Sequence, residues 1–282
     1  MKWNIIADSS CEIFDHDTPN GDVIFNTVPF YITAGSTDYI DNAEIDKDAM
    51  LDSMELPDVV SRTSCPSPYT WFEQFEQADN AIAITISSNL SGSYNSAEVA
   101  CGMIKEKYPE KNVAVIDSRS AGPELIFIID NVMQAIAAGK SFDEVVDMAT
   151  RMQQHSHVIF ALCSFNNLIK NGRMSKLTGF LVGKLGFWGI GIGSDEGTIQ
   201  IKGKARSRKK AITAIIDDLR ERAGAVKTVL ISHCHNLETA EMLKAAIHET
   251  WADAEVRIMP TRGLCSYYAE RGGLIVGFQD QI

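Results

Sequence analysis

The sequence predicts an α/β protein of two domains, with a parallel sheet in the N-terminal domain and a mixed sheet in the C-terminal domain. Three observations lead to this fold class: the length of 282 residues, the alternation of strand-like and helix-like patterns, and a change in that alternation after His155. A chain of this length exceeds a typical single domain, which favours two separate hydrophobic cores. We expect the first domain over residues 1–155 and the second over residues 156–282.

Short apolar runs in the first half indicate buried strands. They read WNIIA, AIAITI and VAVI, at residues 3–7, 81–86 and 113–116. Continuous apolar runs are typical of parallel strands that are covered on both faces. Helical patterns with apolar residues at a 3.6-residue period follow, over residues 91–107, 123–139 and 142–153. This order predicts right-handed crossovers and helices on both faces of the sheet.

The second half begins with a strand over residues 158–163 and continues with an irregular stretch. A glycine-broken apolar segment follows over residues 176–193, and a hairpin is predicted around Asp195–Gly197. The remaining elements complete a mixed α/β unit, with helices over 206–222 and 237–249 and strands over 226–232, 254–259 and 273–278.

Composition argues against several classes of protein. The apolar fraction of 45% and the charged fraction of 22% are those of an ordinary soluble globular protein. A net charge of −11 argues against general nucleic-acid binding, which needs a net basic surface. The six cysteines lack CxxC spacing, which fits reduced thiols better than disulfides or a zinc site.

No stretch of the sequence approaches the roughly 20 apolar residues that a membrane span requires. The opening MKWNIIADSS has too short an apolar run for a signal peptide. We therefore expect a cytoplasmic protein. A transient contact with a membrane surface is compatible with these features.

Hydroxyl residues follow the three predicted strands of the first half, as Asp8-Ser9-Ser10, Ser87-Ser88 and Asp117-Ser118. The carboxyl ends of parallel strands meet at one edge, where helix N-termini supply amide donors. This edge is therefore a candidate anion site. The alternative is that each serine only caps a helix.

The segment ISSNLSGSYNSA at residues 86–97 concentrates this signal, because Ser91, Gly92 and Ser93 would lie where a strand turns into a helix. Gly92 would let a ligand approach the backbone, and the two hydroxyls could donate hydrogen bonds. The segment RTSCPSP at residues 62–68 reads as a proline-stiffened loop. It would offer Thr63 and Ser64 from another direction.

Seven motifs in order along the chain resemble the DegV family. They are DSSCEI (8–13), VPFYI with the later YID (28–32, 39–41), TSCPSP (63–68), ISSNLSGSYNSA (86–97), VIDSRSAG (115–122), NGRMSKL (171–177) and KARSRKKA (204–211). Members of this family are bacterial fatty-acid-binding proteins, and several present the acyl chain to a separate fatty-acid kinase. The resemblance implies a DegV-like fold and a bound long-chain fatty acid.

The resemblance also implies which residues hold the fatty-acid carboxylate. Thr63, Ser64, Ser91 and Ser93 fall on the carboxylate-holding positions, with Gly92 between the two serines. Neutral donors of this kind can hold a carboxylate and leave one of its oxygens accessible. Two positions depart from the family pattern: Cys65 replaces a glutamine, and Tyr268 replaces a histidine. The tyrosine can still donate to a carboxylate, but it does not titrate near neutral pH.

The acyl tail needs an apolar tunnel, which we expect at the junction of the two domains. The segment LTGFLVGKLGFWGIGIG at residues 177–193 is the best candidate for its wall. The side chains expected to fill the space are those of Phe180, Leu181, Leu185 and Phe187. The alternative interpretation is that this segment is an ordinary core helix followed by a strand.

A local basic cluster stands out from the acidic background of the chain. It consists of Lys202, Lys204, Arg206, Arg208, Lys209 and Lys210, with Lys170, Arg173 and Lys176 in a separate motif. A solvated helix face is the simpler interpretation. The family resemblance implies in addition that Arg173 and Arg206 belong to a surface that docks an ATP-dependent fatty-acid kinase subunit.

Other functions remain as alternatives. His233-Cys234-His235 offers two imidazoles at a strand end, which is an incomplete zinc site. No GxSxG motif is present, yet a serine hydrolase or a phosphotransferase acting on a small acidic substrate at the same edge is the rival hypothesis. The main prediction is a lipid-binding protein that is not itself a catalyst and has no metal and no cofactor besides its fatty-acid ligand.

Overall fold

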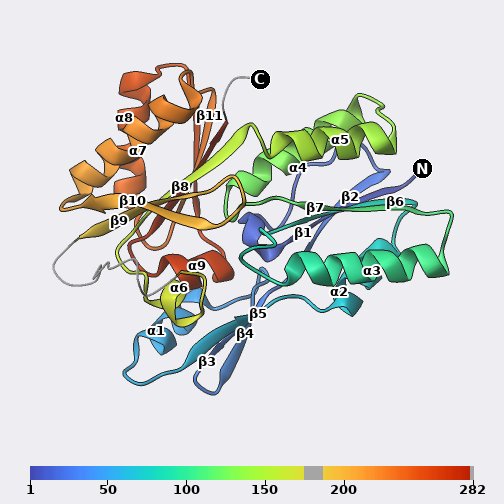
Figure 1. Ribbon diagram of the computed structural model, residues 1–282, viewed down its shortest axis with the longest axis horizontal. Helices are drawn as coiled ribbons and strands as arrows, with labels where there is room; N and C mark the ends of the chain where they lie inside the picture. Colours follow the sequence, from blue (N-terminus) through green and yellow to red (C-terminus); the bar gives the residue numbers. More distant parts are fainter. Residues whose placement is uncertain (175–186, 280–282) are drawn as a thin grey trace.

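The structure, a computed structural model, describes residues 1–174 and 187–279 (Figure 1). Within these residues the strands form a parallel four-stranded sheet, a mixed six-stranded sheet and a small three-stranded sheet. The first two sheets confirm the predicted fold class. The division into domains at residues 155 and 156 stays a prediction.

The four-stranded sheet has the order β2-β1-β6-β7, and all its neighbouring strands are parallel. Its strands are β1 (Trp3–Asp8), β2 (Val23–Val28), β6 (Asn80–Thr85) and β7 (Asn112–Asp117). Helices α2 (Pro68–Phe75) and α3 (Ser93–Lys107) cover one face, and α4 (Glu124–Ala137) and α5 (Phe142–Met152) cover the other. Ile5 packs under α4 and α5, whereas Ile6 packs under α2 and α3, so β1 is buried on both faces.

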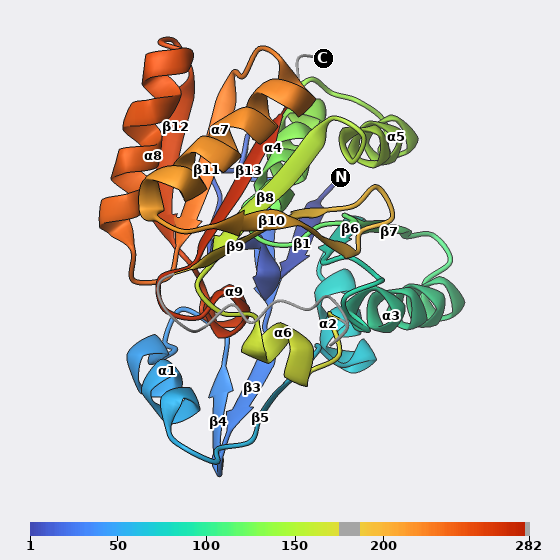
Figure 2. The ribbon, with the colours of Figure 1, turned by 60° about the vertical axis from the view of Figure 1, so that its left-hand side comes forward.

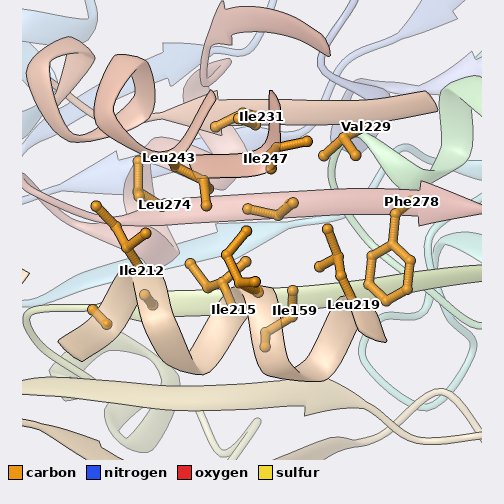
Figure 3. Packing of buried hydrophobic residues seen from close by; sticks show 14 of the residues in the cluster. Ile159, Ile212, Ile215, Leu219, Val229, Ile231, Leu243, Ile247, Leu274 and Phe278 are labelled. Atoms are coloured by element: carbon orange, nitrogen blue, oxygen red, sulfur yellow. The ribbon is translucent and has the colours of Figure 1, made fainter. Parts of the chain in front are cut away.

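The six-stranded sheet has the order β10-β9-β8-β13-β11-β12, and only its pair β11-β12 is parallel among the described strands. Its strands are β8 (Ser156–Leu162), β9 (Trp188–Gly193), β10 (Ile199–Ala205), β11 (Thr228–His233), β12 (Glu255–Pro260) and β13 (Leu274–Gln279). Helices α7 (Arg208–Ala223) and α8 (Leu237–Thr250) pack on one face. Figure 3 shows this core, in which Ile215 and Leu219 of α7 point toward Ile159 and Phe278 on the sheet.

The three-stranded sheet is antiparallel, with the order β4-β3-β5. Its strands are β3 (Tyr31–Ala34), β4 (Thr37–Ile40) and β5 (Ser61–Ser64), and helix α1 (Lys47–Glu55) lies beside them. Two short helices from later in the chain, α6 (Asn166–Lys170) and α9 (Gly263–Ala269), lie between this sheet and the six-stranded sheet (Figure 2). Ile32, Met50, Phe160 and Tyr267 share one hydrophobic cluster. The small sheet therefore packs against the C-terminal part of the chain.

Helix α4 packs against both large sheets. Leu125 and Ile128 belong to the core of the parallel sheet, whereas Ile126 and Phe127 pack against Leu230 of β11. The approach to β13 is close because Gly277 has no side chain. A Cβ atom at that position would lie 2.9 Å from the backbone nitrogen of Glu124, at the start of α4.

The elements missed by the sequence analysis are short or polar. They are β2, β3, β4, β5, α1, α2, α6 and α9. The interpretation of residues 62–68 as a loop was wrong for Thr63 and Ser64, which lie on β5 because Thr63 pairs with Ile32 across an antiparallel ladder. Helix α3 begins at Ser93, two residues later than predicted, because Gly92 forms its N-cap.

Three of the predicted tunnel residues, Phe180, Leu181 and Leu185, lie outside the described residues. Within residues 1–174 and 187–279, no helix has both the length and the apolar character needed to cross a membrane.

Candidate functional site

A pocket lies where the three sheets meet. Residues after β6 and β7 line it on the parallel-sheet side, including Ile86, Ser91 and Ala121. Phe160 and Leu162 of β8 form part of the opposite side. The predicted edge of the parallel sheet therefore faces the second core. This is the place where the carboxyl ends of parallel strands meet and where ligands bind in open α/β sheets.

Most of the pocket wall is apolar. Phe30 and Ile86 come from the parallel-sheet side, Leu162 from β8, Ile199 from β10 and Ile275 from β13. Such a wall offers an acyl chain hydrocarbon contacts and no hydrogen-bonding partners along these strands.

One part of the pocket is polar, and we call Thr63, Ser91, Arg173 and Tyr268 its head end. All four residues line the pocket. The hydroxyl groups of Thr63 on β5 and Tyr268 on α9 lie 2.8 Å apart and share a hydrogen bond. Burial raises the pKa of Tyr268 above its ordinary value, while the hydrogen bond to Thr63 opposes the rise. The phenol is therefore neutral at physiological pH and can donate its proton.

Arg173 reaches the head end from the turn after α6. Gly172 permits this turn, because its φ of 76° is in the left-handed region that glycine adopts without strain. The Nε of Arg173 donates to the carbonyl oxygen of Leu90 at 3.1 Å, and a terminal guanidinium nitrogen donates to the carbonyl of Asn171. These contacts place a positive charge beside Ser91. The family resemblance implies a docking role for this arginine and does not predict its place in the pocket.

Ser93 is fully buried and hydrogen-bonds to a carboxylate instead of lining the pocket in the described structure. Its hydroxyl donates to Oδ2 of Asp8 at 2.7 Å. The same oxygen accepts from the backbone nitrogen of Ile86 at 2.9 Å, and Oδ1 of Asp8 accepts from the hydroxyl of Ser10 at 2.6 Å. Burial raises the pKa of Asp8, and the hydrogen bonds from Ser10 and Ser93 oppose this rise. The side chain of Ser91 in turn accepts from the backbone nitrogen of Ser93.

The remaining two predicted carboxylate residues lie next to the head end. Ser64 follows Thr63 on β5 and is exposed, and Gly92 is exposed at the start of α3. A Cβ atom at Gly92 would lie 3.4 Å from the sulfur of Cys65. Cys65 therefore lies against the backbone that precedes α3. The role of these residues in holding a carboxylate stays a prediction.

Several of the strand-end hydroxyls form hydrogen bonds within the protein, although the three described here do not cap a helix. Ser9 accepts from the backbone nitrogen of Phe30, and Ser118 donates to the carbonyl of Ser120. Ser87 donates to the carbonyl of Gly197 at 2.7 Å, which ties the β9-β10 hairpin to the end of β6.

This hairpin contributes to the pocket. Asn89 donates to the carbonyl of Glu196 at 2.6 Å, and Gly193, Gly197 and Thr198 are among the lining residues. Arg119, which was not among the predicted site residues, also lines the pocket. Its position directly after the Asp117-Ser118 strand end was the signal that could have identified it.

Helix α9, which carries Tyr268, is fixed at its first turn by Asp41. The two carboxylate oxygens of Asp41 accept from the backbone nitrogens of Gly263 at 2.7 Å and Leu264 at 2.9 Å. Asp41 is the last residue of the YID motif, and it is fully buried. A residue far away in the sequence therefore sets the position of the helix that supplies Tyr268.

The predicted docking residue Arg206 lies on an exposed part of the surface after β10. Its guanidinium carbon is 5.7 Å from the ring centre of Phe187, and the Nζ of Lys204 is 5.8 Å from the same ring. Phe187 therefore packs against the basic cluster, and it does not line the pocket in the described part of the chain.

The paired imidazoles of the His233-Cys234-His235 sequence have separate partners. His233 accepts from the backbone nitrogen of Asn236 at 3.2 Å, and His235 lies 2.7 Å from a carboxylate oxygen of Asp48. Among the described residues, no group of three or more His, Cys, Asp or Glu side chains is arranged to hold a metal ion.

Comparisons with known proteins agree with this architecture. The sequence model of the DegV family, described as a family of uncharacterised proteins, matches residues 2–279. A DegV domain-containing protein of Streptococcus pneumoniae is 38% identical over 279 residues, or 99% of each chain. The crystal structure of the Streptococcus pneumoniae fatty acid kinase (Fak) B3 protein, loaded with linoleic acid, matches with a TM-score of 0.96 and 38% identity over 100% of both chains. A DegV family protein from Eubacterium eligens, loaded with heptadecanoic acid, matches with a TM-score of 0.94 and 33% identity over 99% of this chain and 100% of its own. The chain therefore belongs to the DegV family.

Proposed function

We propose that the protein binds one long-chain fatty acid in this pocket, with the carboxylate at the head end and the tail along the apolar wall. The observation that carries the proposal is the meeting of Thr63, Arg173 and Tyr268 at one part of a mostly apolar pocket. Two similar structures, at 38% and 33% identity, are described as loaded with linoleic acid and heptadecanoic acid.

The tail supplies most of the binding free energy in this proposal. Burial of a methylene group gains roughly 0.8 kcal/mol, so a chain of about fifteen methylenes offers about 12 kcal/mol before the cost of association. That cost is about 4 to 15 kcal/mol. The head end then selects the ligand, because an ester or an alcohol carries no negative charge to pair with the guanidinium of Arg173 as a carboxylate does.

The hydroxyl groups and the guanidinium have different tasks. Tyr268 and Thr63 each offer a neutral hydrogen bond worth roughly 0.5 to 1.5 kcal/mol. Arg173 adds a charge that favours the ionised form of the ligand. Since two donors of Arg173 are already bound to the carbonyls of Leu90 and Asn171, the guanidinium cannot enclose the carboxylate with all its nitrogens.

The extraction of bound lipid tests this function directly. We expect native mass spectrometry of the purified protein to show one acyl chain per polypeptide, and lipid extraction to release a fatty acid. Repeated absence of an acyl chain, together with failure of the delipidated protein to take up oleic acid, would falsify the proposal.

We further propose that the protein presents the fatty acid to an ATP-dependent fatty-acid kinase and is not itself a catalyst. The similar pneumococcal structure is named as a fatty acid kinase B3 protein. The hydroxyl of Ser93 donates to the carboxylate of Asp8, and an activated serine nucleophile needs a neighbouring base such as an imidazole. This geometry favours a binding role over the serine hydrolase alternative.

The docking role of Arg206 is testable with a fatty-acid kinase and ATP. We expect Arg206→Ala to lower the rate of acyl-phosphate formation about tenfold while fatty-acid affinity is unchanged, because Arg206 lies outside the pocket. Arg220→Ala on α7 is the matched control, since Arg220 is an exposed arginine beyond the basic cluster. Equal rates for both variants would show that Arg206 does not take part in docking. Arg173→Ala is expected to lower fatty-acid affinity as well as the rate.

A further inference from the structure

Tyr267, the neighbour of Tyr268 on α9, is fully buried and has a hydroxyl with two side-chain partners. The Nδ2 of Asn171 donates to this hydroxyl at 2.9 Å, and the hydroxyl of Ser61 lies 2.9 Å away on another side. Because the asparagine amide is a donor, the phenol accepts from it and is left with its own proton to donate to Ser61. One oxygen atom thus connects three segments of the chain.

These three segments are the ones that carry the head end. Ser61 precedes Thr63 by two residues on β5, and Asn171 precedes Arg173 by two residues in the turn after α6. Tyr267 itself precedes Tyr268, and the two rings pack edge to face with their centres 4.9 Å apart. The contact network therefore passes from Tyr267 to every head-end residue except Ser91.

Further contacts between α6 and α9 depend on the same residue. The backbone carbonyl of Tyr267 accepts from Nδ2 of Asn167 at 2.8 Å. Nδ2 of Asn171 also donates to the carbonyl of Asn167, which closes the turn that leads to Arg173. Helix α6 has five residues, too short to hold its shape without such tertiary contacts. The position of Arg173 therefore depends on α9.

We propose that Tyr267 is a positioning residue that holds Thr63, Arg173 and Tyr268 at the spacing that one carboxylate requires. This inference rests on the proposed fatty-acid function. Loss of the phenol oxygen leaves Asn171 and Ser61 without their shared partner, so the turn before Arg173 and the end of β5 lose their common anchor. The apolar wall makes no use of this oxygen. Loss of this oxygen should therefore weaken the binding of the carboxylate and leave the contacts of the acyl tail unchanged.

The substitution Tyr267→Phe removes only the oxygen atom. We expect it to lower the affinity of the delipidated protein for oleic acid about tenfold, as expected when charge-assisted hydrogen bonds are misplaced. Affinity for methyl oleate, which has the same tail and no charge, should change less than about twofold because the apolar contacts remain. Equal losses for the two ligands, or no loss for either, would overturn the proposal.

Tyr39→Phe is the matched control. The hydroxyl of Tyr39 on β4 also makes two hydrogen bonds, to the carbonyl of Ala49 at 3.2 Å and to the hydroxyl of Ser53 at 3.0 Å. These partners belong to α1, and Tyr39 is not among the described residues that line the pocket. The control should therefore lower stability by a similar amount and leave the preference for oleic acid over methyl oleate unchanged.

A measurement without ligand separates the failure of this inference from failure of the proposed function. Amide hydrogen exchange over residues 166–173 should be faster in Tyr267→Phe than in the wild type, and unchanged in Tyr39→Phe. Unchanged exchange in Tyr267→Phe would overturn the positioning role. A wild type that binds neither ligand would overturn the proposed function, whereas exchange would still report the link between Tyr267 and Arg173.

Ser61→Ala provides a second variant in case Tyr267→Phe does not fold. It removes the hydrogen bond between Ser61 on β5 and the hydroxyl of Tyr267, and Ser61 is only partly buried. We expect a smaller loss of oleic acid affinity, about twofold to threefold, with methyl oleate again unaffected. A loss of the same size for both ligands would contradict the inference.

Discussion

The head end and the apolar wall of the pocket are built in different ways. Much of the wall consists of residues on strands of the six-stranded sheet, such as Phe160 on β8 and Ile275 on β13, which backbone ladders hold in register. The head end consists of residues on short segments, namely β5, α9 and the turn after α6. Side-chain hydrogen bonds such as that between Thr63 and Tyr268 connect these segments.

This difference assigns separate properties of the ligand to separate parts of the structure. An apolar wall contributes binding free energy in proportion to the hydrocarbon area that is buried, so it distinguishes poorly between similar tails. A head end with placed donors distinguishes strongly, because each donor that lacks its acceptor stays unpaired when water is excluded. Affinity should therefore respond most to changes in the wall, and selectivity to changes at the head end.

The largest expected effect is that of a charge in the wall. Ile199 on β10 lines the pocket and is partly buried, so Ile199→Asp should lower oleic acid affinity by at least about 100-fold with a modest loss of stability. Ile201→Asp is the control, because Ile201 lies two residues along the same strand, is also partly buried and is not among the described lining residues. Titration calorimetry on delipidated protein measures both. Equal losses would show that the tail does not lie along β10.

A smaller effect is expected for the hydroxyl pair at the head end. Thr63→Val and Tyr268→Phe should each lower oleic acid affinity about twofold to tenfold, the range for one neutral hydrogen bond. Since the two hydroxyls share a hydrogen bond, the double variant should lose less than the product of the single losses. Full additivity would mean that the two groups act on the ligand independently. Methyl oleate shows how much of each loss depends on the charge of the head group.

The smallest effect on ligand affinity is expected at Glu124, which lies between the two large sheets. Its carboxylate accepts from Ser156 at 2.8 Å and from Ser120, a pocket residue. Burial raises the pKa of Glu124 from 4.5 to about 7. Between these pH values the folded protein keeps a proton that the unfolded chain has released, so stability falls as pH rises through this window, by about 3 kcal/mol in total.

Glu124→Gln removes this titrating group and should flatten the fall in stability between pH 4.5 and pH 7. Urea unfolding at several pH values measures the difference between the variant and the wild type. If the stability of the variant and of the wild type changed in parallel with pH, the pKa of Glu124 would not be raised in the folded protein. Oleic acid affinity at pH 7 should change little, because Glu124 is not among the described residues that line the pocket.

The sequence predicted the long strands and helices because their apolar periodicity reflects burial over many residues. The pattern of β1, for example, follows from helices on both faces of the sheet. The short segments of the head end lack this signal. The strand β5 reads Ser-Arg-Thr-Ser, and α6 has five residues that include two asparagines. Tertiary contacts make them a strand and a helix, and such contacts are not local properties of a sequence.

The candidate site shows the same division. Thr63, Ser91 and Tyr268 could be predicted from family motifs, and all three line the pocket. The place of Arg173 in the pocket could not, because it depends on how α6 lies against α9. The hydrogen-bond partner of Ser93 could not be predicted either. Asp8 is 85 residues away along the chain and reaches it only because β1 and β6 are neighbours.

The position of α4 has a consequence for how the molecule unfolds. Its residues belong to the cores of both large sheets, and Gly277 lets its first turn approach β13 closely. Neither sheet can therefore lose its structure without exposing apolar residues of α4, the helix that also packs against the other sheet. Two halves linked by an ordinary connector can melt separately. Here we expect a single cooperative transition, in which the calorimetric and van't Hoff enthalpies agree, so that the pocket between the sheets is lost only when the whole chain unfolds.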